Sequence, residues 1–461
     1  MKHYDIIIIG GGRSTTLAQK AAEAGKSVAL IERDRLGGTC PNRGCVPSKL
    51  IIGYADVAKR IQESARHHIT ASIESIDLKQ IFTDLNTWVE KVDPRYESRF
   101  PEDLTLYRGH GKFVSNKVVE ITNNQGTEQI TADKIVIATG ARSRPADFQQ
   151  LPVWTSDDLF PFPHAIPKSI AIVGGGFIAC ELANFFHSVG IKTTLIVRSN
   201  KLLPAEDQSI SAIFKSEFSE FVPTKFQTTI TDANYENSAF TLTLQNEEGQ
   251  SELQVDALLY ATGRIPNTES LGLENTDIKT SKRGFIERND NLETDVAGVF
   301  ATGDVGGSYQ LQHAASFEVN HLLENFLTDT STPISAPLMP HAVFTDPEIA
   351  SVGVTEQDLE KNGISPDDVV IVETNWNSSA RALSWRIQYP RTKLIVRKSD
   401  YSILGCHMIG PESSTMIHQI LTVIHLDNDI RKIQTMIHIH PSLSESLLAC
   451  VAEAINKIKA S

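Results

Sequence analysis

The stretch from Ile6 to Thr15 reads Ile-Ile-Ile-Ile-Gly-Gly-Gly-Arg-Ser-Thr. Four consecutive isoleucines predict a buried strand, and the glycines predict that it ends in a tight turn. A helix-like segment and a second apolar run, residues 27–31, follow. A short strand that runs into glycines and then into a helix is the opening of a βαβ unit.

The glycines of this turn predict a dinucleotide site. Gly10 permits the turn, and Gly12 lets the backbone approach a pyrophosphate, which the N–H groups at the start of the helix would bind. Glu32 follows Gly12 by twenty residues, where a carboxylate can accept hydrogen bonds from ribose hydroxyls. Thr15 replaces the usual third glycine. The alternative is a plain glycine turn with a surface glutamate.

The same pattern recurs in residues 170–176, Ile-Ala-Ile-Val-Gly-Gly-Gly, and a second strand-like run follows at 193–197. Gly174 and Gly176 repeat the spacing of the first motif. Arg198 stands where an acidic residue would mark NAD, and an arginine there can pair with a 2′-phosphate. We therefore favour NADPH over NADH, the alternative being a solvated arginine at a strand end.

The repeats predict an α/β fold with two Rossmann-like dinucleotide-binding domains and a C-terminal α+β domain. Apolar runs ending in Ala-Thr-Gly recur at 138–140, 261–263 and 301–303, so the chain is expected to return to the first domain after the second. The predicted ranges are 1–145 and 265–336 for the first domain, 146–264 for the second and 337–461 for the third. In the third, strands are predicted at 368–374, 392–397 and 403–409, and helices at 414–426 and 443–459.

The composition and net charge of the chain exclude or disfavour several classes of protein. The 461 residues are 41% hydrophobic and 21% charged, which excludes whole-chain disorder and a collagen or disulfide scaffold. The net charge of −13 disfavours nucleic-acid and anionic-membrane partners. No run of about 18 apolar residues predicts a membrane span, and the first residues do not resemble a secretory signal. The expected location is therefore the cytoplasm.

Five cysteines, an odd and sparse set, do not suit a secreted disulfide framework. Only Cys40 and Cys45 are close in sequence, in residues 37–49, Gly-Gly-Thr-Cys-Pro-Asn-Arg-Gly-Cys-Val-Pro-Ser-Lys. Pro47 fits the first turn of a helix, whose dipole favours a thiolate. The spacing is not that of a zinc site, so we predict no metal. Between two nucleotide motifs, the pair is predicted to be a redox disulfide rather than two inert thiols.

A histidine motif near the C-terminus, residues 438–445, reads His-Ile-His-Pro-Ser-Leu-Ser-Glu. Histidine can move a proton near neutral pH, and a carboxylate can fix its tautomer. His440 and Glu445 are candidates for these two roles because the cysteines need a proton carrier. A structural histidine is the alternative.

In this order, the motifs resemble those of the flavin-dependent (class I) pyridine nucleotide–disulfide oxidoreductases. That group includes glutathione reductase, mycothione reductase, dihydrolipoamide dehydrogenase and mercuric reductase. The resemblance rests on both glycine motifs, the cysteine motif, Ala-Thr-Gly-Asp at 301–304 and His-Pro-x-x-x-Glu at 440–445, and it covers nearly the whole chain. It implies FAD in the first domain, a nicotinamide nucleotide in the second and a homodimer formed by the C-terminal domain.

The resemblance also implies residue roles. Cys45 would form a charge-transfer thiolate with the flavin, Cys40 would exchange with the substrate, and Lys49, paired with Glu181, would lie near the reactive flavin nitrogen. His440, oriented by Glu445, would act as acid and base across the dimer interface. The implied FAD site comprises Gly10, Gly12, Glu32, Thr39, Lys49, Gly111, Gly140, Asp304 and His313. The implied nicotinamide site comprises Gly174, Gly176, Phe177, Arg198 and Gly263.

The expected reaction is NADPH-dependent reduction of a low-molecular-weight disulfide through flavin and Cys40–Cys45. The alternative is an NAD-dependent dihydrolipoamide dehydrogenase, which residues 109–112 and 438–445 resemble more closely. A nucleotide-binding module without redox function would not require the cysteine and histidine motifs. Arg43, inside the cysteine motif, is either a contact for a substrate carboxylate or an ordinary exposed arginine.

Overall fold

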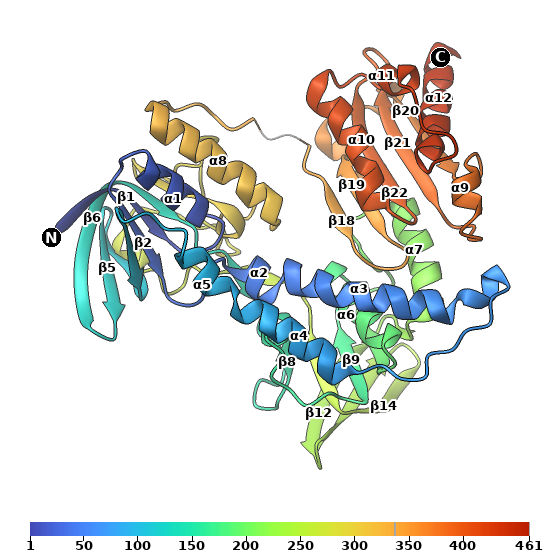
Figure 1. Ribbon diagram of the computed structural model, residues 1–461, viewed down its shortest axis with the longest axis horizontal. Helices are drawn as coiled ribbons and strands as arrows, with labels where there is room; N and C mark the ends of the chain where they lie inside the picture. The colour runs from blue at the N-terminus through green and yellow to red at the C-terminus, as the bar shows by residue number, and fades with distance from the viewer. Residues whose placement is uncertain (336–337, 461) are drawn as a thin grey trace.

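The computed structural model describes residues 1–335 and 338–460 (Figure 1). Its first domain is built on a seven-stranded sheet with the order β3-β2-β1-β6-β5-β4, and β17 pairs with β6. The pairs β3–β2, β2–β1, β1–β6 and β6–β17 are parallel, and β4–β5–β6 is an antiparallel extension. The strands are β1 (Lys2–Ile9), β2 (Val28–Glu32), β3 (Leu104–Arg108), β4 (His110–Ser115), β5 (Val118–Asn123), β6 (Gly126–Ile137) and β17 (Val299–Ala301).

The second domain repeats the parallel core of the first. Its sheet has the order β11-β10-β9-β15-β8, in which β10–β9–β15 corresponds to β2–β1–β6. The strands are β8 (Trp154–Thr155), β9 (Ser169–Val173), β10 (Lys192–Ile196), β11 (Thr224–Lys225) and β15 (Ala257–Tyr260). An antiparallel sheet that the sequence did not predict adds β12 (Thr229–Glu236), β13 (Ala239–Asn246) and β14 (Gly249–Val255).

Burial explains the two isoleucine-rich motifs. The side chains of Ile6 to Ile9 are at most 3% exposed, and Ile170 and Ile172 are fully buried. Parallel strands covered on both faces carry continuous apolar runs, as residues 6–9 and 170–173 do. Each strand then passes through glycines into a helix, α1 (Thr15–Glu23) after β1 and α6 (Phe177–Ser188) after β9. Both predicted βαβ openings are thus present.

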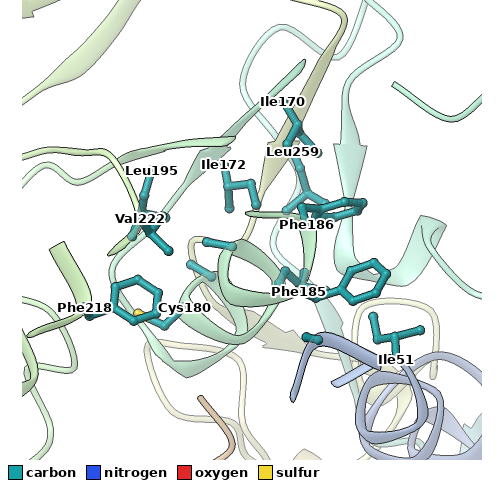
Figure 2. Close-up of a cluster of buried hydrophobic side chains, with 14 of the residues drawn as sticks. Ile51, Ile170, Ile172, Cys180, Phe185, Phe186, Leu195, Phe218, Val222 and Leu259 are labelled. Atoms are coloured by element: carbon teal, nitrogen blue, oxygen red, sulfur yellow. The ribbon is translucent and has the colours of Figure 1, made fainter. Parts of the chain in front are cut away.

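A shared core joins the two dinucleotide-type domains. Figure 2 shows Ile51 in the same cluster as Phe185 and Phe186, which belong to α6. Ile51 lies on α3 (Cys45–Gln62), the helix that begins at the second cysteine. Burying each such side chain contributes about 1.5–3 kcal/mol. The core therefore holds the cysteine helix of the first domain against the second domain.

The C-terminal domain is an antiparallel sheet with helices, so the predicted α+β character is confirmed. Its strand order is β18-β19-β22-β21-β20. The strands are β18 (His341–Val343), β19 (Ile349–Gly353), β20 (Val369–Asn375), β21 (Arg391–Arg397) and β22 (Ile403–Ile409). Its long helices are α10 (Ser413–Leu426) and α12 (Ser444–Ala460). The predicted boundary at residues 336–337 lies outside the described residues.

The remaining helices connect these sheets. They are α2 (Thr39–Arg43), α4 (Leu78–Glu90), α5 (Val92–Glu97), α7 (Gln208–Phe221), α8 (Gln312–Thr328), α9 (Ala380–Leu383) and α11 (Arg431–Thr435). A two-stranded link, β7 (Ala141–Ser143) with β16 (Arg264–Pro266), joins the ends of the two parallel sheets. Within residues 1–335 and 338–460, no helix is long and apolar enough to cross a membrane.

Candidate active site

A short helix and a long helix present the cysteines. Cys40 lies in α2 and Cys45 begins α3, with Gly44 between the helices. A Cβ atom added to Gly44 would lie 3.1 Å from the carbonyl oxygen of Thr39, so the turn is tight. The buried Asn42 amide donates hydrogen bonds of 2.9 Å to the carbonyls of Leu36 and Gly38. The Asn42 side chain therefore fixes the loop to the backbone that precedes it.

The two thiols are free and differ in acidity. The Cys40 thiol donates a hydrogen bond to Cys45. This hydrogen bond, against the opposing effect of desolvation and with help from the charge of Lys49, lowers the pKa of Cys45 to about 7. The same hydrogen bond and burial raise the pKa of Cys40 far above its ordinary value. When the pair loses its first proton, the thiolate is therefore on Cys45 rather than on Cys40.

Lys49, one turn into α3, forms an ion pair with Glu181 of α6. Lys49 Nζ lies 2.5 Å from Glu181 Oε2, and the other carboxylate oxygen accepts a 3.0 Å hydrogen bond from the backbone N–H of Phe344. Burial raises the pKa of Glu181, although the positive charge of Lys49 opposes this shift. The pair connects three segments that are far apart in sequence.

The cysteines and the first glycine motif line one cavity of about 670 Å³. Thirteen of the residues that the sequence analysis assigned to the site lie along its wall: Gly10, Gly12, Glu32, Thr39, Cys40, Cys45, Lys49, Gly111, Gly140, Phe177, Glu181, Asp304 and His313. The structure thus brings together segments from across the first 313 residues.

In the first glycine motif, Gly10 and Gly12 are glycines for two different reasons. Gly10 has a φ of 109°, and a Cβ there would lie 2.4 Å from the carbonyl oxygen of Ala138, so only glycine fits. A Cβ on Gly12 would meet only Gly38, at 3.8 Å. The fold itself does not require Gly12, but a ligand that approaches this backbone would. The side chain of Thr15, in place of a third glycine, donates a hydrogen bond to the Gly12 carbonyl.

The polar groups of the cavity fit a dinucleotide with a charged pyrophosphate. Arg13 Nε and Gln310 Nε2 are buried donors without a hydrogen-bond partner among the described residues, and both side chains line the cavity. Glu32 lies at the end of β2 and accepts backbone hydrogen bonds from Gly11 (2.6 Å) and Asp34 (2.7 Å). Burial raises the pKa of Glu32. Its carboxylate is thereby fixed at the cavity wall.

Arg264, which the sequence did not lead us to predict, forms an ion pair with Asp304 of the Ala-Thr-Gly-Asp motif. Its Nε lies 3.9 Å from Asp304 Oδ2, and the same side chain is 3.7 Å from Asp157 Oδ1. Burial raises the pKa of Asp304, against the charge of Arg264. A signal was present, because Arg264 directly follows the second Ala-Thr-Gly run at 261–263.

The second glycine motif repeats the geometry of the first. A Cβ on Gly174 (φ 139°) would lie 2.5 Å from the carbonyl oxygen of Ala261, and nothing lies within 4 Å of a Cβ on Gly176. Gly263 also has a positive φ, of 124°. Arg198 is exposed beyond the end of β10 and has no ion-pair or hydrogen-bond partner in the described part of the chain. These four residues do not line the 670 Å³ cavity.

Phe177 links the second glycine motif to the cavity that the first glycine motif lines. It is the first residue of α6, directly after Gly176, and its side chain lines the first cavity while 44% exposed. The ring of Phe177 therefore lies next to the second glycine motif and at the wall of the cavity that holds the cysteines.

His440 and Glu445 are paired but lie away from the cavity. His440 Nδ1 is 2.7 Å from Glu445 Oε1, and this hydrogen bond lowers the pKa of Glu445. The Ser442 N–H holds the second carboxylate oxygen at 2.9 Å. The His440 side chain is 79% exposed, and its neighbours Ile437 and Ile439 are 100% and 79% exposed. A single chain therefore does not bring His440 to the cysteines.

Two further predicted positions have local partners. Arg43 forms an ion pair of 2.6 Å with Asp34 at the cavity wall. His313, at the start of α8, bonds through Nε2 to the carbonyl oxygen of Pro340 at 2.7 Å. Within residues 1–335 and 338–460, no group of three or more His, Cys, Asp or Glu residues is arranged to hold a metal ion.

Two family models match the chain. The model described as pyridine nucleotide-disulphide oxidoreductase matches residues 4–318, and its dimerisation domain matches residues 339–450. Together they account for most of the sequence.

Curated relatives and a solved structure agree with these matches. The chain is 31% identical over 454 residues to a dihydrolipoyl dehydrogenase of Buchnera aphidicola subsp. Acyrthosiphon pisum, covering 96% of this chain and 94% of the relative. It is 30% identical to that of Bacillus subtilis, with 96% of each chain covered. A solved copper(II) complex of the HOCl-induced flavoprotein disulfide reductase RclA from Escherichia coli matches with a TM-score of 0.85 and 26% identity, covering 98% of this chain and 100% of that one.

Proposed function

The chain belongs to the class I pyridine nucleotide–disulfide oxidoreductase family, and on this premise we propose that it reduces a low-molecular-weight disulfide with NADPH. The family is FAD-dependent and uses a pyridine nucleotide. One observation supports the proposal most strongly. The Cys40 and Cys45 thiols lie in the same cavity as the first glycine motif and Lys49.

When bound, FAD supplies two-electron transfer between the nicotinamide and the disulfide. We assign its binding to the first glycine motif with Glu32 and Asp304, and its pyrophosphate to the N–H groups after Gly12 and to Arg13. Lys49, fixed by Glu181, places a positive charge beside Cys45. The second glycine motif, with Arg198 and Gly263, would hold the nicotinamide nucleotide, and Phe177 would close the passage from that motif to the cysteines.

The cysteines carry out two exchanges. Cys40, as thiolate, attacks one sulfur of the substrate disulfide, forms a mixed disulfide and releases the first thiolate. Cys45 then attacks the Cys40 sulfur, restores the Cys40–Cys45 disulfide and releases the second thiolate. The two electrons that reopen Cys40–Cys45 come from NADPH. The sum is NADPH, one proton and one disulfide giving NADP⁺ and two thiols.

Because the pKa of Cys40 is raised, Cys40 needs a base to attack and its leaving groups need an acid. His440 suits both roles, but it lies outside the cavity of its own chain. We propose that His440 of a second copy completes each site in a homodimer. The exposed Ile437 and Ile439 beside it, and the dimerisation-domain match, support this arrangement.

A second candidate function is favoured by the relatives named dihydrolipoyl dehydrogenase. Such an enzyme would use the same groups in reverse, oxidising a dithiol and reducing NAD⁺. Arg198 favours the first candidate because a guanidinium attracts a 2′-phosphate. Both candidates suit the predicted cytoplasmic location, because a reducing compartment would keep Cys40 and Cys45 available for disulfide exchange.

The test is steady-state kinetics on FAD-loaded protein. NADPH and NADH would each be offered with a panel of low-molecular-weight disulfides, and NAD⁺ with dihydrolipoamide. We expect NADPH oxidation with at least one disulfide, a loss of at least about a thousandfold in C40S, and retention in C450A, which changes a cysteine remote from the site. Activity only with NAD⁺ and dihydrolipoamide would establish the second candidate, and full activity of C40S would refute both.

A further inference from the structure

A histidine–carboxylate pair forms part of the cavity wall and has no role in the exchange reactions. His341, the first residue of β18, lines the cavity, and its Nε2 lies 2.7 Å from Glu206 Oε1. The second oxygen of Glu206 accepts a 2.7 Å hydrogen bond from Ser351 on β19. The side chain of His341 is 35% exposed and that of Glu206 only 5%. The imidazole therefore faces the cavity, and the carboxylate lies behind it.

His341 lies on the segment of the cavity wall that leads to the Lys49–Glu181 pair. Three residues later, the backbone N–H of Phe344 binds Glu181, the partner of Lys49. Lys49 Nζ also lies 4.8 Å from the centre of the Phe344 ring. The wall segment that carries His341 thus continues directly to the groups beside Cys45.

The surroundings favour a positively charged His341. Burial would lower its pKa, but the hydrogen bond and charge of Glu206 raise it above the ordinary histidine value. The other titratable or charged groups on the elements around the pair are Lys49 (α3), Glu181 (α6), Asp207 (before α7), His313 (α8), Lys393 (β21), His407 (β22) and His418 (α10). Of these, Lys393 forms ion pairs with Asp207 at 2.7 Å and with Glu356 at 2.5 Å, and burial lowers the pKa of His407.

We propose that His341, held by Glu206, is a tuning residue whose positive charge stabilises the negative charge that FAD gains on reduction, and thereby raises the flavin reduction potential. A cation at a cavity wall stabilises nearby negative charge more strongly than it would in bulk water, because the local dielectric constant is lower. The proposal rests on the proposed function, since it requires FAD in this cavity.

The experiment measures the two-electron reduction potential of bound flavin by equilibration with a reference dye. H341Q keeps a donor toward Glu206 but loses the charge. We expect the equilibrium constant for flavin reduction to fall about tenfold, or about 30 mV for a two-electron couple. H341K restores a charge and should recover most of the loss.

The pH dependence of the flavin potential distinguishes an effect of the His341 charge from an effect of the side-chain shape. The difference between wild type and H341Q should be largest below the raised pKa of His341 and should vanish as the pH rises through it, because the histidine is then neutral. H418Q is the matched control, since His418 lines the same cavity and bonds to the Ser414 carbonyl, and none of the carboxylates in residues 1–335 and 338–460 is its partner. It should leave the potential unchanged.

Each result of these experiments either supports the tuning role of His341 or overturns it. If H341Q binds FAD with the wild-type potential at every pH, or if its offset persists unchanged at high pH, the tuning role is wrong and the pair is only structural. A wild-type protein that binds no FAD, or whose flavin neither nucleotide reduces, overturns the proposed function and this inference together. Normal reduction of wild type with an unshifted H341Q overturns this inference alone.

Discussion

Lys49 Nζ lies 2.5 Å from Glu181 Oε2, although the two residues are 132 positions apart. The contact joins α3, which begins with Cys45, to α6, which follows the second glycine motif. Its geometry couples the cysteine helix to the domain expected to hold the nicotinamide nucleotide. Because a buried ion pair is costly to break, it also fixes how the two domains meet.

This pair is expected to set the acidity of Cys45. The charge of Lys49 lowers the pKa of Cys45 and that of Glu181 raises it. In the reduced protein, the Cys45 thiolate should therefore titrate near pH 7, K49M should raise that midpoint by about one unit, and E181Q should lower it. Thiolate absorbance, or the rate of alkylation against pH, measures the midpoint. Identical midpoints in all three proteins would show that Lys49 does not act on Cys45.

The first glycine motif allows a fold defect to be separated from a binding defect. G10A places a Cβ against the Ala138 carbonyl at a positive φ and should destabilise the protein by about 2 kcal/mol or more. G12A meets nothing closer than 3.8 Å and should fold normally, yet bind FAD about tenfold more weakly, or about 1.4 kcal/mol. Thermal unfolding and flavin titration measure the two effects. Wild-type FAD affinity in G12A would place the dinucleotide elsewhere.

Arg198 is expected to decide between the nucleotides. R198E replaces a partner of the 2′-phosphate by a repelling charge, so the ratio of kcat/KM for NADPH over NADH should fall by about tenfold to a hundredfold. K192E makes the same charge change at the other end of β10 and should leave the ratio unchanged. An equal ratio in R198E and wild type would remove the argument for NADPH.

The shared active site predicts complementation between inactive proteins. C40S and H440Q homodimers should each lack activity, but a mixed dimer contains one site with Cys40 from one chain and His440 from the other. Random mixing should restore about a quarter of wild-type activity, because half of the dimers are mixed and each has one intact site. Absence of recovery in dimers shown to be mixed would mean that the site lies within one chain.

Local patterns predicted the parts of the fold that local chemistry determines. The three predicted C-terminal strands and two predicted helices lie within one residue of β20, β21, β22, α10 and α12, since periodicity and turn chemistry act over short spans. The strand predicted at Ile6 begins four residues earlier, at Lys2, and β18 and β19 were not predicted. The sheet β12–β14 was not predicted, because no glycine or nucleotide motif marks it. The roles assigned to the site residues remain predictions, although thirteen of those residues share one cavity.

The sequence pattern did not predict contacts between residues that are far apart in the sequence. The His341–Glu206 pair spans 135 positions and forms only because β18 of the C-terminal domain packs beside the segment before α7. Nothing adjacent to either residue indicates the other. The Lys49–Glu181 pair was expected only from the resemblance, for the same physical reason.

The central claim is that the Cys40–Cys45 disulfide accepts electrons through the flavin, and that Cys45, once reduced to the thiolate, lies against the flavin. It is tested most directly by anaerobic titration of the FAD-loaded protein with NADPH and with NADH in separate cuvettes. Reduction by NADPH should produce the long-wavelength thiolate–flavin charge-transfer band in wild type and no such band in C45S. Flavin-loaded wild type that shows no band with either nucleotide would contradict the claim.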